Sequence, residues 1–521
     1  MADRARPLGV GGGLGIAAAV AIPGLILVTG AALLWTAVPG RGPGPADWAA
    51  IRFTLWQAAL SALVSVSLAI PVARALARRQ FSGRGIVITL LGAPFLLPTI
   101  VAIFGLVAIF GRGGVLNAAL DALGLPPVSI YGAHGVILAH VFYNLPLATR
   151  LIFQGWQEIP SERFRLAATL DMDAAAVNRH LERPMLKKVL PGAALIIFVI
   201  CTTSFAVALT LGGGPRATTV ELAIYQAVRF EFDLSRAAIL SVIQLAVTGA
   251  AALIALRFAG TAGFGAGLDR QIPRWDAKQI PLRVWDAAVI SAASLFLILP
   301  LAAVIVRGAA AIPDLPNSVW EAALRSLGVA VCSTVLVVGA ALAMALASLR
   351  LARRGALVEG AGLLAVAASP LVIGTGLFIL IHPVADPARL ALPITAVINA
   401  VMTLPFALRA LIPALTKVED DFGRLADSLD LTGWARLRLL VLPRLARPLG
   451  FSAGLAAALS MGDLGVVALF ADPAQSTLPH QIYALMGAYR MESAAGASVL
   501  LLGLSLALFW MFDRGGRHAD A

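Results

Sequence analysis

The chain has 521 residues, of which 59% are hydrophobic and only 13% charged, whereas a soluble protein carries about a quarter charged residues. Its formal net charge of +12 would suggest a nucleic-acid partner in a soluble protein, but here the charges follow a membrane topology. Two cysteines, six scattered histidines and no phosphate-binding GxxxxGK[ST] motif exclude a disulfide framework and predict no metal, no cofactor and no ATP site on this chain.

Twelve apolar segments are long enough to cross a hydrocarbon layer of ~30 Å, which takes about 20 helical residues. They lie at 13–38, 53–77, 86–110, 133–156, 189–211, 236–258, 284–307, 326–349, 357–382, 392–415, 449–471 and 496–512. The first lacks a small-residue cleavage site, which favours an uncleaved anchor over a signal peptide. The ninth contains Pro370 and several glycines, so its boundaries are the least regular.

Basic residues gather on alternate connections between these segments. With the N-terminus in the cytoplasm, most of the 40 Lys and Arg residues fall on the cytoplasmic side, as the positive-inside rule requires. Clear clusters contain Arg74, Arg78, Arg79 and Arg84; Arg179, Arg183, Lys187 and Lys188; and Arg436, Arg438, Arg444 and Arg447. The pattern predicts a multi-pass protein in a lipid bilayer with both termini in the cytoplasm and no nucleic-acid partner.

The second half of the sequence repeats the first. The stretch 143–150 (YNLPLATR) returns at 402–409 (MTLPFALR), and 165–171 (RLAATLD) returns at 424–430 (RLADSLD), both with an offset of 259 residues. The offset is 272 near Thr54 and 258 near Thr219. Apolar helices can match by chance in leucine and alanine, but chance would not keep Pro, Arg and Asp in register through a polar loop.

The repeat predicts the architecture. We expect an all-α integral membrane protein of about 12 transmembrane helices, with six in each of two repeats at 1–258 and 284–521 and a cytoplasmic linker at 259–283. Because six is an even number, the two repeats insert in the same orientation and are related by an axis along the membrane normal. Such a pair encloses a central path.

Each half also carries a long cytoplasmic loop, at 157–188 and 416–448. In the first, a helix is followed by a turn at Asp171, a short helix that Asp173 can cap, and Pro184, which we expect to end it. In the second, Asp430, Thr432 and Pro443 stand at the same places. A lone solvated basic loop would explain one copy, but not two copies in register.

These loops resemble the EAA loop of ABC-importer permeases, whose pattern is Glu-Ala-Ala, three residues, Gly and a distant proline. The first three positions here contain Arg165 and Ala167 in one copy, and Arg424 and Ala426 in the other. Asp171 and Asp430 replace the glycine, and Asp tolerates the left-handed backbone that such a turn needs. The resemblance implies MetI-like permease domains whose short helices dock on an ABC ATPase subunit, in two copies, that drives alternating access.

The outer stretches at 204–226 and 462–490 are similar to the permeases of bacterial thiamine ABC importers. That resemblance implies uptake of thiamine, thiamine monophosphate or thiamine diphosphate, delivered by a periplasmic substrate-binding protein, across the bacterial inner membrane. It implies a transport subunit and no enzyme. A ferric-iron ABC importer permease is the alternative, because fused iron permeases share this architecture. A secondary transporter is a remote alternative, since the crossings are nearly free of ionisable relays.

Four polar residues in the crossings are candidates for the translocation path or its gate: Asn144, Ser204, Thr403 and Asp463. An ionisable residue at membrane depth is a functional candidate, so Asp463 could meet a thiazolium cation. It could instead help to break its helix beside two glycines. Asn144 and Thr403 each stand close to a proline, where a purely structural kink is the alternative.

Overall fold

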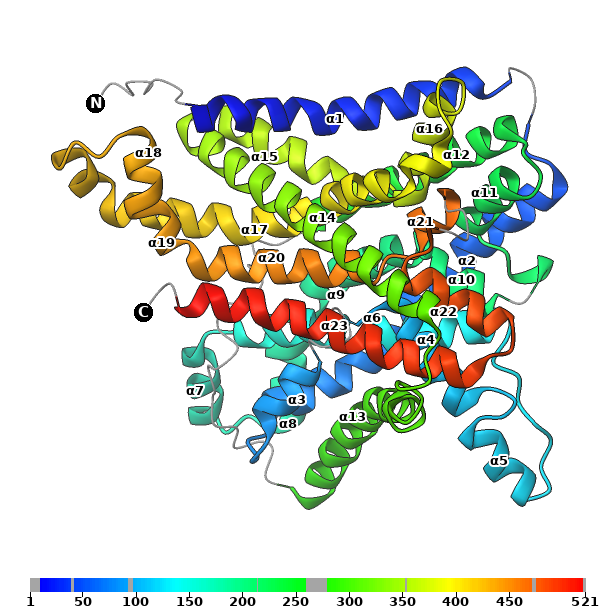
Figure 1. Ribbon diagram of the computed structural model, residues 1–521. Coiled ribbons are helices and arrows are strands. Elements are labelled where there is room, and N and C mark those ends of the chain that lie inside the picture. Colours follow the sequence, from blue (N-terminus) through cyan, green and yellow to red (C-terminus); the bar gives the residue numbers. More distant parts are fainter. Residues whose placement is uncertain are drawn as a thin grey trace.

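Every secondary-structure element in the described residues is a helix, which confirms the all-α class. The computed structural model describes residues 10–38, 42–91, 97–212, 214–258, 279–351, 354–470 and 475–518. Eleven helical stretches in these ranges are long and apolar enough to cross a membrane, and a shorter apolar helix covers Pro370–Ile381. The first helix begins, and the last helix finishes, on the same side of the bundle (Figure 1). An even number of crossings requires this arrangement.

The helices of the first half cover the predicted segments, two of which, 86–110 and 189–211, are each divided into two helices. They are α1 (Val10–Thr36), α2 (Pro45–Arg78), α3 (Arg84–Leu90), α4 (Thr99–Phe110), α5 (Val115–Ala122), α6 (Ala133–Gln157), α7 (Ser161–Thr169), α8 (Ala174–Val177), the π turn η2 (Asn178–Glu182), α9 (Arg183–Thr202), α10 (Phe205–Leu211), the 3-10 turn η3 (Pro215–Ala217), α11 (Val220–Arg229) and α12 (Leu234–Phe258).

The second half repeats this order with fewer short helices. It contains α13 (Ile280–Ala309), α14 (Asn317–Arg350), α15 (Gly355–Leu363), the 3-10 turn η6 (Leu364–Ala367), α16 (Pro370–Ile381), the 3-10 turn η7 (Pro387–Leu390), α17 (Ala391–Ser428), α18 (Gly433–Arg436), the π turn η8 (Leu437–Val441), α19 (Leu442–Arg444), α20 (Ala446–Met461), α21 (Gly465–Phe470), α22 (Leu478–Gly487) and α23 (Met491–His518).

The third crossing of each half is interrupted, and in the second half the break falls at Pro370, inside the segment 357–382 whose boundaries the sequence left least regular. Pro370 has no amide hydrogen to continue the preceding helix and instead opens α16. The Ser369 hydroxyl caps that new helix by accepting hydrogen bonds from the Leu371 and Val372 amides. In the first half, α3 ends at Leu90 and α4 begins after Pro98, at the corresponding place.

The first helix of each half packs on the opposite half. Helix α1 contacts α14, α15 and α16, while α13 contacts α2, α3 and α4. A methyl group on Gly105 of α4 would lie 2.6 Å from the Pro300 carbonyl oxygen of α13, and one on Gly376 of α16 would lie 2.6 Å from the Thr29 Cβ of α1. Such small residues let helix backbones meet. The two repeats of the sequence are therefore not two separate packing units, because the first helix of each half packs on the other half. Most of the predicted linker, 259–278, lies outside the described residues.

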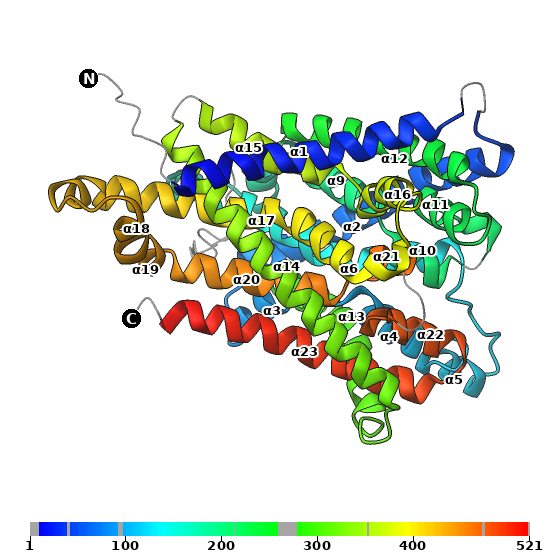
Figure 2. The ribbon, with the colours of Figure 1, turned by 45° about the horizontal axis from the view of Figure 1, so that its top comes forward.

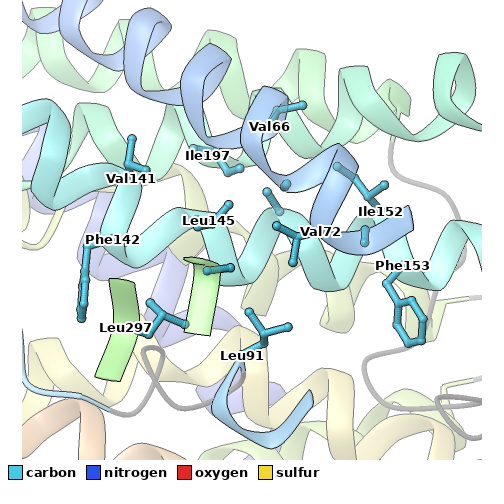
Figure 3. Close-up of a cluster of buried hydrophobic side chains, with 14 of the residues drawn as sticks. Val66, Val72, Leu91, Val141, Phe142, Leu145, Ile152, Phe153, Ile197 and Leu297 are labelled. Carbon is cyan, nitrogen blue, oxygen red and sulfur yellow. The ribbon is translucent and has the colours of Figure 1, made fainter. Parts of the chain in front are cut away.

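A buried apolar cluster in the first half shows the consequence (Figure 3). It joins Val66 of α2, Leu145 and Ile152 of α6 and Ile197 of α9. Leu297 of α13, the first helix of the second half, completes it and is fully buried. Each bundle thus depends on one helix from the other half. The two views of the ribbon show the same interleaving of blue and green helices (Figures 1 and 2).

Candidate functional site

The loop at 157–188, named the first docking loop because the resemblance predicts that it docks on an ATPase, is a compact helix–turn–helix. Pro160 ends the run of α6 and lets α7 begin at Ser161, because a proline is tolerated just ahead of a new helix. After α7 the backbone turns at Asp171, whose φ of 52° is the left-handed conformation predicted for this position. The Asp173 carboxylate then accepts a hydrogen bond of 2.8 Å from the Ala176 amide, which caps α8 as predicted.

The second docking loop (416–448) has the same turn on a longer lever. Glu419 stands where the first loop has Pro160, so α17 continues without a break to Ser428. Asp430 has a φ of 50°, matching Asp171. Thr432 occupies the cap position before α18, but its side chain makes no capping hydrogen bond. The predicted cap by Thr432 was therefore wrong, while the turn itself is confirmed.

The two prolines do not end the short helices as expected. Pro184 lies in the first turn of α9, and Pro443 lies in the first turn of α19, where a missing amide hydrogen costs no intrahelical bond. In both loops a π turn, η2 or η8, precedes the proline and occupies matching residues of the repeat. The docking segment therefore continues into the membrane crossing as one helical rod, interrupted only at Leu445 in the second half.

Both loops expose apolar side chains at matching positions. Leu166 of α7 and Leu170, which directly follows that helix, are 60% and 64% exposed. Leu425 of α17 and Leu429, which directly follows that helix, are 56% and 61% exposed. Arg165 and Arg424 are exposed beside them, while Ala167 and Ala426 face inward and are buried. A pocket of about 530 Å³ in the first loop is lined by Arg163, Leu166, Ala167, Leu170, Met172, His180 and Leu181. A repeated apolar patch at the polar end of the bundle is typical of a protein contact.

Each docking helix is tied to the bundle by ion pairs. In the first loop, Glu182 is fully buried and its carboxylate lies 2.7 Å from the Arg74 guanidinium of α2. In the second, Arg436 of α18 pairs with Glu419 and Asp427 of α17. These contacts join each short helix to a crossing beside it. Figure 1 shows both docking loops at the left end of the molecule, with the start of α1 and the end of α23.

The four predicted path residues fall at two kinds of place. Asn144 of α6 and Thr403 of α17 are buried, and each bonds back to its own helix: Asn144 to the His140 carbonyl and Thr403 to the Asn399 carbonyl, at 2.8 and 2.7 Å. A gating role for these two stays a prediction. Ser204 and Asp463 each follow the end of a helix, between α9 and α10 and between α20 and α21.

Asp463 sits at the break in its crossing. Its Oδ1 accepts a hydrogen bond of 3.3 Å from the Gly465 amide, and its buried Oδ2 has no hydrogen-bond partner among the described residues. The helix-breaking role that the sequence allowed is therefore present. A methyl group on Gly465 would lie 3.5 Å from the Phe205 ring, so the breaks of the two halves face each other.

Beyond these breaks the two halves are joined by apolar side chains. One outer cluster combines Phe205, Val220 and Ile224 of the first half with Leu371 and Phe470 of the second. The pseudo-equivalent cluster combines Ile100 and Phe104 with Met461, Leu464 and Ile482. The same hydrogen bond recurs beside each cluster, from the Val220 amide to Thr54 Oγ1 and from the Leu478 amide to Ser326 Oγ. Apolar side chains of both halves thus fill the interface at this end of the bundle.

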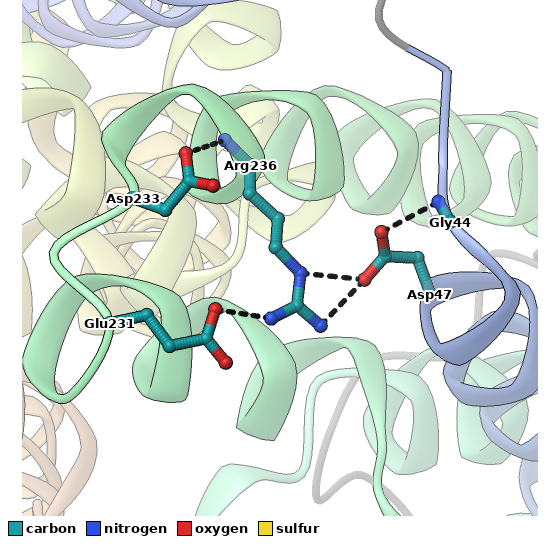
Figure 4. Close-up of polar contacts among 5 residues, drawn as sticks. All are labelled: Gly44, Asp47, Glu231, Asp233 and Arg236. Atoms are coloured by element: carbon teal, nitrogen blue, oxygen red, sulfur yellow. Dashed lines mark hydrogen bonds and ion pairs between the residues drawn. The ribbon is translucent and has the colours of Figure 1, made fainter.

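A polar cluster lies in the first half at the end of the bundle opposite the docking loops (Figure 4). The Arg236 guanidinium at the start of α12 pairs with Asp47 at the start of α2, at 2.7 Å, and with Glu231. Asp47 also accepts a hydrogen bond of 2.9 Å from the Gly44 amide. Valine stands at the position matching Asp47 in the second half, Val319. The outer surface is therefore less symmetric than the membrane core.

The sequence reasoning did not single out several buried acidic residues: Glu182, Asp286 and Glu221. Glu221 of α11 is 1% exposed and receives a hydrogen bond from Gln244 of α12. It stands in an outer stretch that carried the resemblance, but its position in the crossing bundle could not be derived from the apolar pattern around it. A comparison of the halves would have found it, since Pro479 occupies the matching position.

No protein-family model matches the chain. Among curated proteins, the chain is 40% identical to the thiamine transport system permease protein ThiP of Brucella abortus over 520 residues, which cover 96% of this chain and 95% of that protein. It is 37% identical to the protein of the same name from Escherichia coli, over 99% and 98% of the two chains. A probable sulfate transport system permease protein from Helicosporidium is 24% identical over 40% of this chain.

Proposed function

Because this chain belongs to the family of thiamine transport system permeases, we propose that it is the transmembrane subunit of an ABC importer that takes up thiamine and its phosphates. It is a transport permease, and the proposal leaves ATP hydrolysis to a separate subunit. The single observation that carries the mechanism is the duplicated docking loop, with its left-handed turns at Asp171 and Asp430.

Two docking surfaces call for two ATPase copies. Leu166 and Leu170 in one loop and Leu425 and Leu429 in the other supply apolar contacts, and the π turns give each lever the same shape. When two motor subunits close around ATP, both levers approach each other, and the rods α9 and α20 carry that movement into the membrane. This is a rigid-body transition of two bundles about their interface.

The proposed cycle is alternating access. The closed outer clusters correspond to a state before the substrate is accepted. ATP binding separates these clusters, a periplasmic binding protein releases thiamine, thiamine monophosphate or thiamine diphosphate between the halves, and hydrolysis restores the closed outer side. We place the docking loops and both termini in the cytoplasm and the protein in the bacterial inner membrane, as the basic clusters of the sequence favour.

Replacing the two docking segments tests the proposal. Residues 173–181 and 432–440 are exchanged for Gly/Ser linkers, separately and together, in a strain that carries the transport system. We expect the double exchange to reduce uptake of radiolabelled thiamine to background, because a flexible linker transmits no force. Insertion of the protein into the membrane is measured in parallel by immunoblotting of membrane fractions.

The controls separate the alternative functions. Unlabelled thiamine abolishes uptake of the label, whereas ferric iron does not, and dissipating the ion gradients while ATP is maintained leaves uptake in place. Unchanged uptake after the double exchange would exclude the docking role. Inhibition by iron, or loss of uptake with the ion gradient, would favour an iron importer or a secondary transporter.

A further inference from the structure

Glu221 is the centre of a small buried polar cluster between the halves. Its Oε1 accepts a hydrogen bond of 3.2 Å from Gln244 Nε2, which also donates to the Thr202 carbonyl at 2.8 Å. The Ser369 hydroxyl lies against the same carboxylate. All three side chains are at most 1% exposed, and Glu221 Oε2 has no hydrogen-bond partner in the part of the chain that the structure describes.

The cluster lies at membrane depth, where several crossings are interrupted. Gln244 is ten residues from the start of α12, which is roughly 15 Å along a helix and about half of a 30 Å hydrocarbon layer. Helix α11, which carries Glu221, contacts α10, α16 and α21, and each of these begins just after a break in its crossing. Figures 1 and 2 both show α11 and α16 on the same side of the bundle, toward the end opposite the docking loops.

The second half has no counterpart of this cluster. Pro479 matches Glu221, because the N-cap positions Thr219 and Thr477 align α11 with α22. Leu501 matches Gln244, because the buried pairs Ala237-Ala238 and Ala494-Ala495 align α12 with α23. Pro98 matches Ser369, since each directly precedes the helix after the break. Three buried polar residues thus correspond to three buried apolar residues.

The absence of this polar cluster from the second half indicates that the fold does not need it. Burying a carboxylate is unfavourable unless all its partners are present, and here one oxygen is left without a hydrogen bond. The same fold closes around proline and leucine in the other half, so packing alone does not require the acid. Nor does a cation neutralise it: Glu221 forms no ion pair within the described ranges.

We propose that Glu221, positioned by Gln244, is a binding group for the positively charged ring of the substrate as it passes between the two halves. The inference rests on the proposed function, since thiamine carries a thiazolium ring with a permanent positive charge. An acidic group with one buried oxygen that has no hydrogen-bond partner among the described residues, held at mid-depth beside several helix breaks, suits an organic cation. The ligand class is therefore a monocationic heteroaromatic ring.

The position of Ser369 makes this site depend on the state of the transporter. Ser369 begins α16 of the second half, whereas Glu221 and Gln244 belong to the first. When the outer clusters separate, α16 moves away from α11, and the carboxylate loses its contact with Ser369 while keeping Gln244. The site is thus covered in the closed state and open to the substrate in the outward state, which gives the differential affinity that alternating access needs.

The test uses the full permease reconstituted in proteoliposomes with its ATPase and a saturating amount of thiamine-loaded binding protein. Saturation makes the maximal uptake rate report the steps after delivery. We expect Glu221→Gln to lower that rate at least tenfold, and Glu221→Asp to retain more uptake than Glu221→Gln. The reason is that Asp keeps the charge while Gln keeps the shape. A purely structural role predicts the opposite order, because Gln is the better isostere.

The matched control is Glu359→Gln on α15, which removes another carboxylate that accepts a hydrogen bond from a serine, Ser348, at 2.7 Å. It should change uptake less than twofold. For all variants, the ATPase activity without binding protein and the midpoint of thermal unfolding in detergent should equal those of the unchanged protein within experimental error. Uptake by Glu221→Gln above half of the unchanged protein, or a rate below it for Glu221→Asp, overturns the cation site. If the unchanged protein does not transport thiamine at all, the proposed function fails, and with it the ligand named here.

Discussion

Asp171 and Asp430 show how a single backbone requirement can survive a change of residue. A left-handed backbone costs an ordinary residue roughly 1–2 kcal/mol, while Asp can stabilise it with its short polar side chain. The structure gives both residues a positive φ, 52° and 50°. The residues around them are less constrained: Asp173 uses its side chain to cap a helix, and Thr432 in the matching place does not.

This difference predicts unequal effects of two matched substitutions. Asp173→Ala removes the bond to the Ala176 amide and should destabilise α8 by ~1 kcal/mol, about a fivefold change in its opening equilibrium. Thr432→Ala removes no capping bond and should leave α18 unchanged. Hydrogen–deuterium exchange of peptides covering 174–182 and 433–441 measures both in the intact protein. Equal changes in the two peptides would contradict the assignment.

At the scale of elements, the interrupted crossings are the main feature that a uniform apolar pattern conceals. A break at membrane depth requires partners for the free backbone groups, and Ser369 and Asp463 supply some of them through bonds to amides. The breaks place short helices such as α16 and α21 at the interface between the halves. Close contact between helices there depends on small residues, since lipid tails are as apolar as leucine.

The contact between α16 and α1 yields a second prediction. A methyl group on Gly376 would lie 2.6 Å from Thr29 Cβ and 2.9 Å from its carbonyl oxygen, so Gly376→Ala should destabilise the protein by ~1–3 kcal/mol through overpacking. Gly360 of α15 has nothing within 4 Å of the same point. Gly360→Ala should therefore be neutral or stabilise the helix by up to ~1 kcal/mol. Thermal unfolding in detergent distinguishes the two; a loss of stability in both would argue against a specific contact.

At the scale of the whole molecule, the two halves are held by exchange of their first helices and by charges at the end that carries the docking loops. Asp286 of α13 is almost fully buried and accepts hydrogen bonds from Arg78 at the end of α2 and from Arg79, which follows it, at 2.9 and 2.6 Å. This cluster joins the second half to the first close to the docking loops.

The third prediction concerns this link. Asp286→Asn leaves two guanidinium groups facing a neutral amide and should lower the free energy of unfolding by about 3 kcal/mol, as expected when a buried ion pair loses one partner. Glu321→Gln removes an ion pair with Arg325 in which Glu321 is 62% exposed, and it should cost ~0–1 kcal/mol. The midpoints of thermal unfolding in detergent measure both. Equal midpoints for the two variants would show that the Asp286 cluster adds no more stability than the exposed ion pair.

The sequence by itself determined the features that depend on local pattern. Apolar length predicted the crossings, the offset between halves predicted the duplicated docking loops, and the chemistry of Asp predicted the turns at Asp171 and Asp430. These features need only neighbouring residues or a comparison of the chain with itself. They were enough for the fold class and for the positions of the two repeated loops.

Only the tertiary structure decided which helices meet. The packing of α1 and α13 on opposite halves, the breaks before α10 and α21, and the cluster around Glu221 all depend on residues far apart in the chain. An apolar helix has nearly the same composition whether it faces lipid or protein, so its sequence does not identify its neighbours. The polar contacts between segments supply that information, and they exist only once the chain has folded.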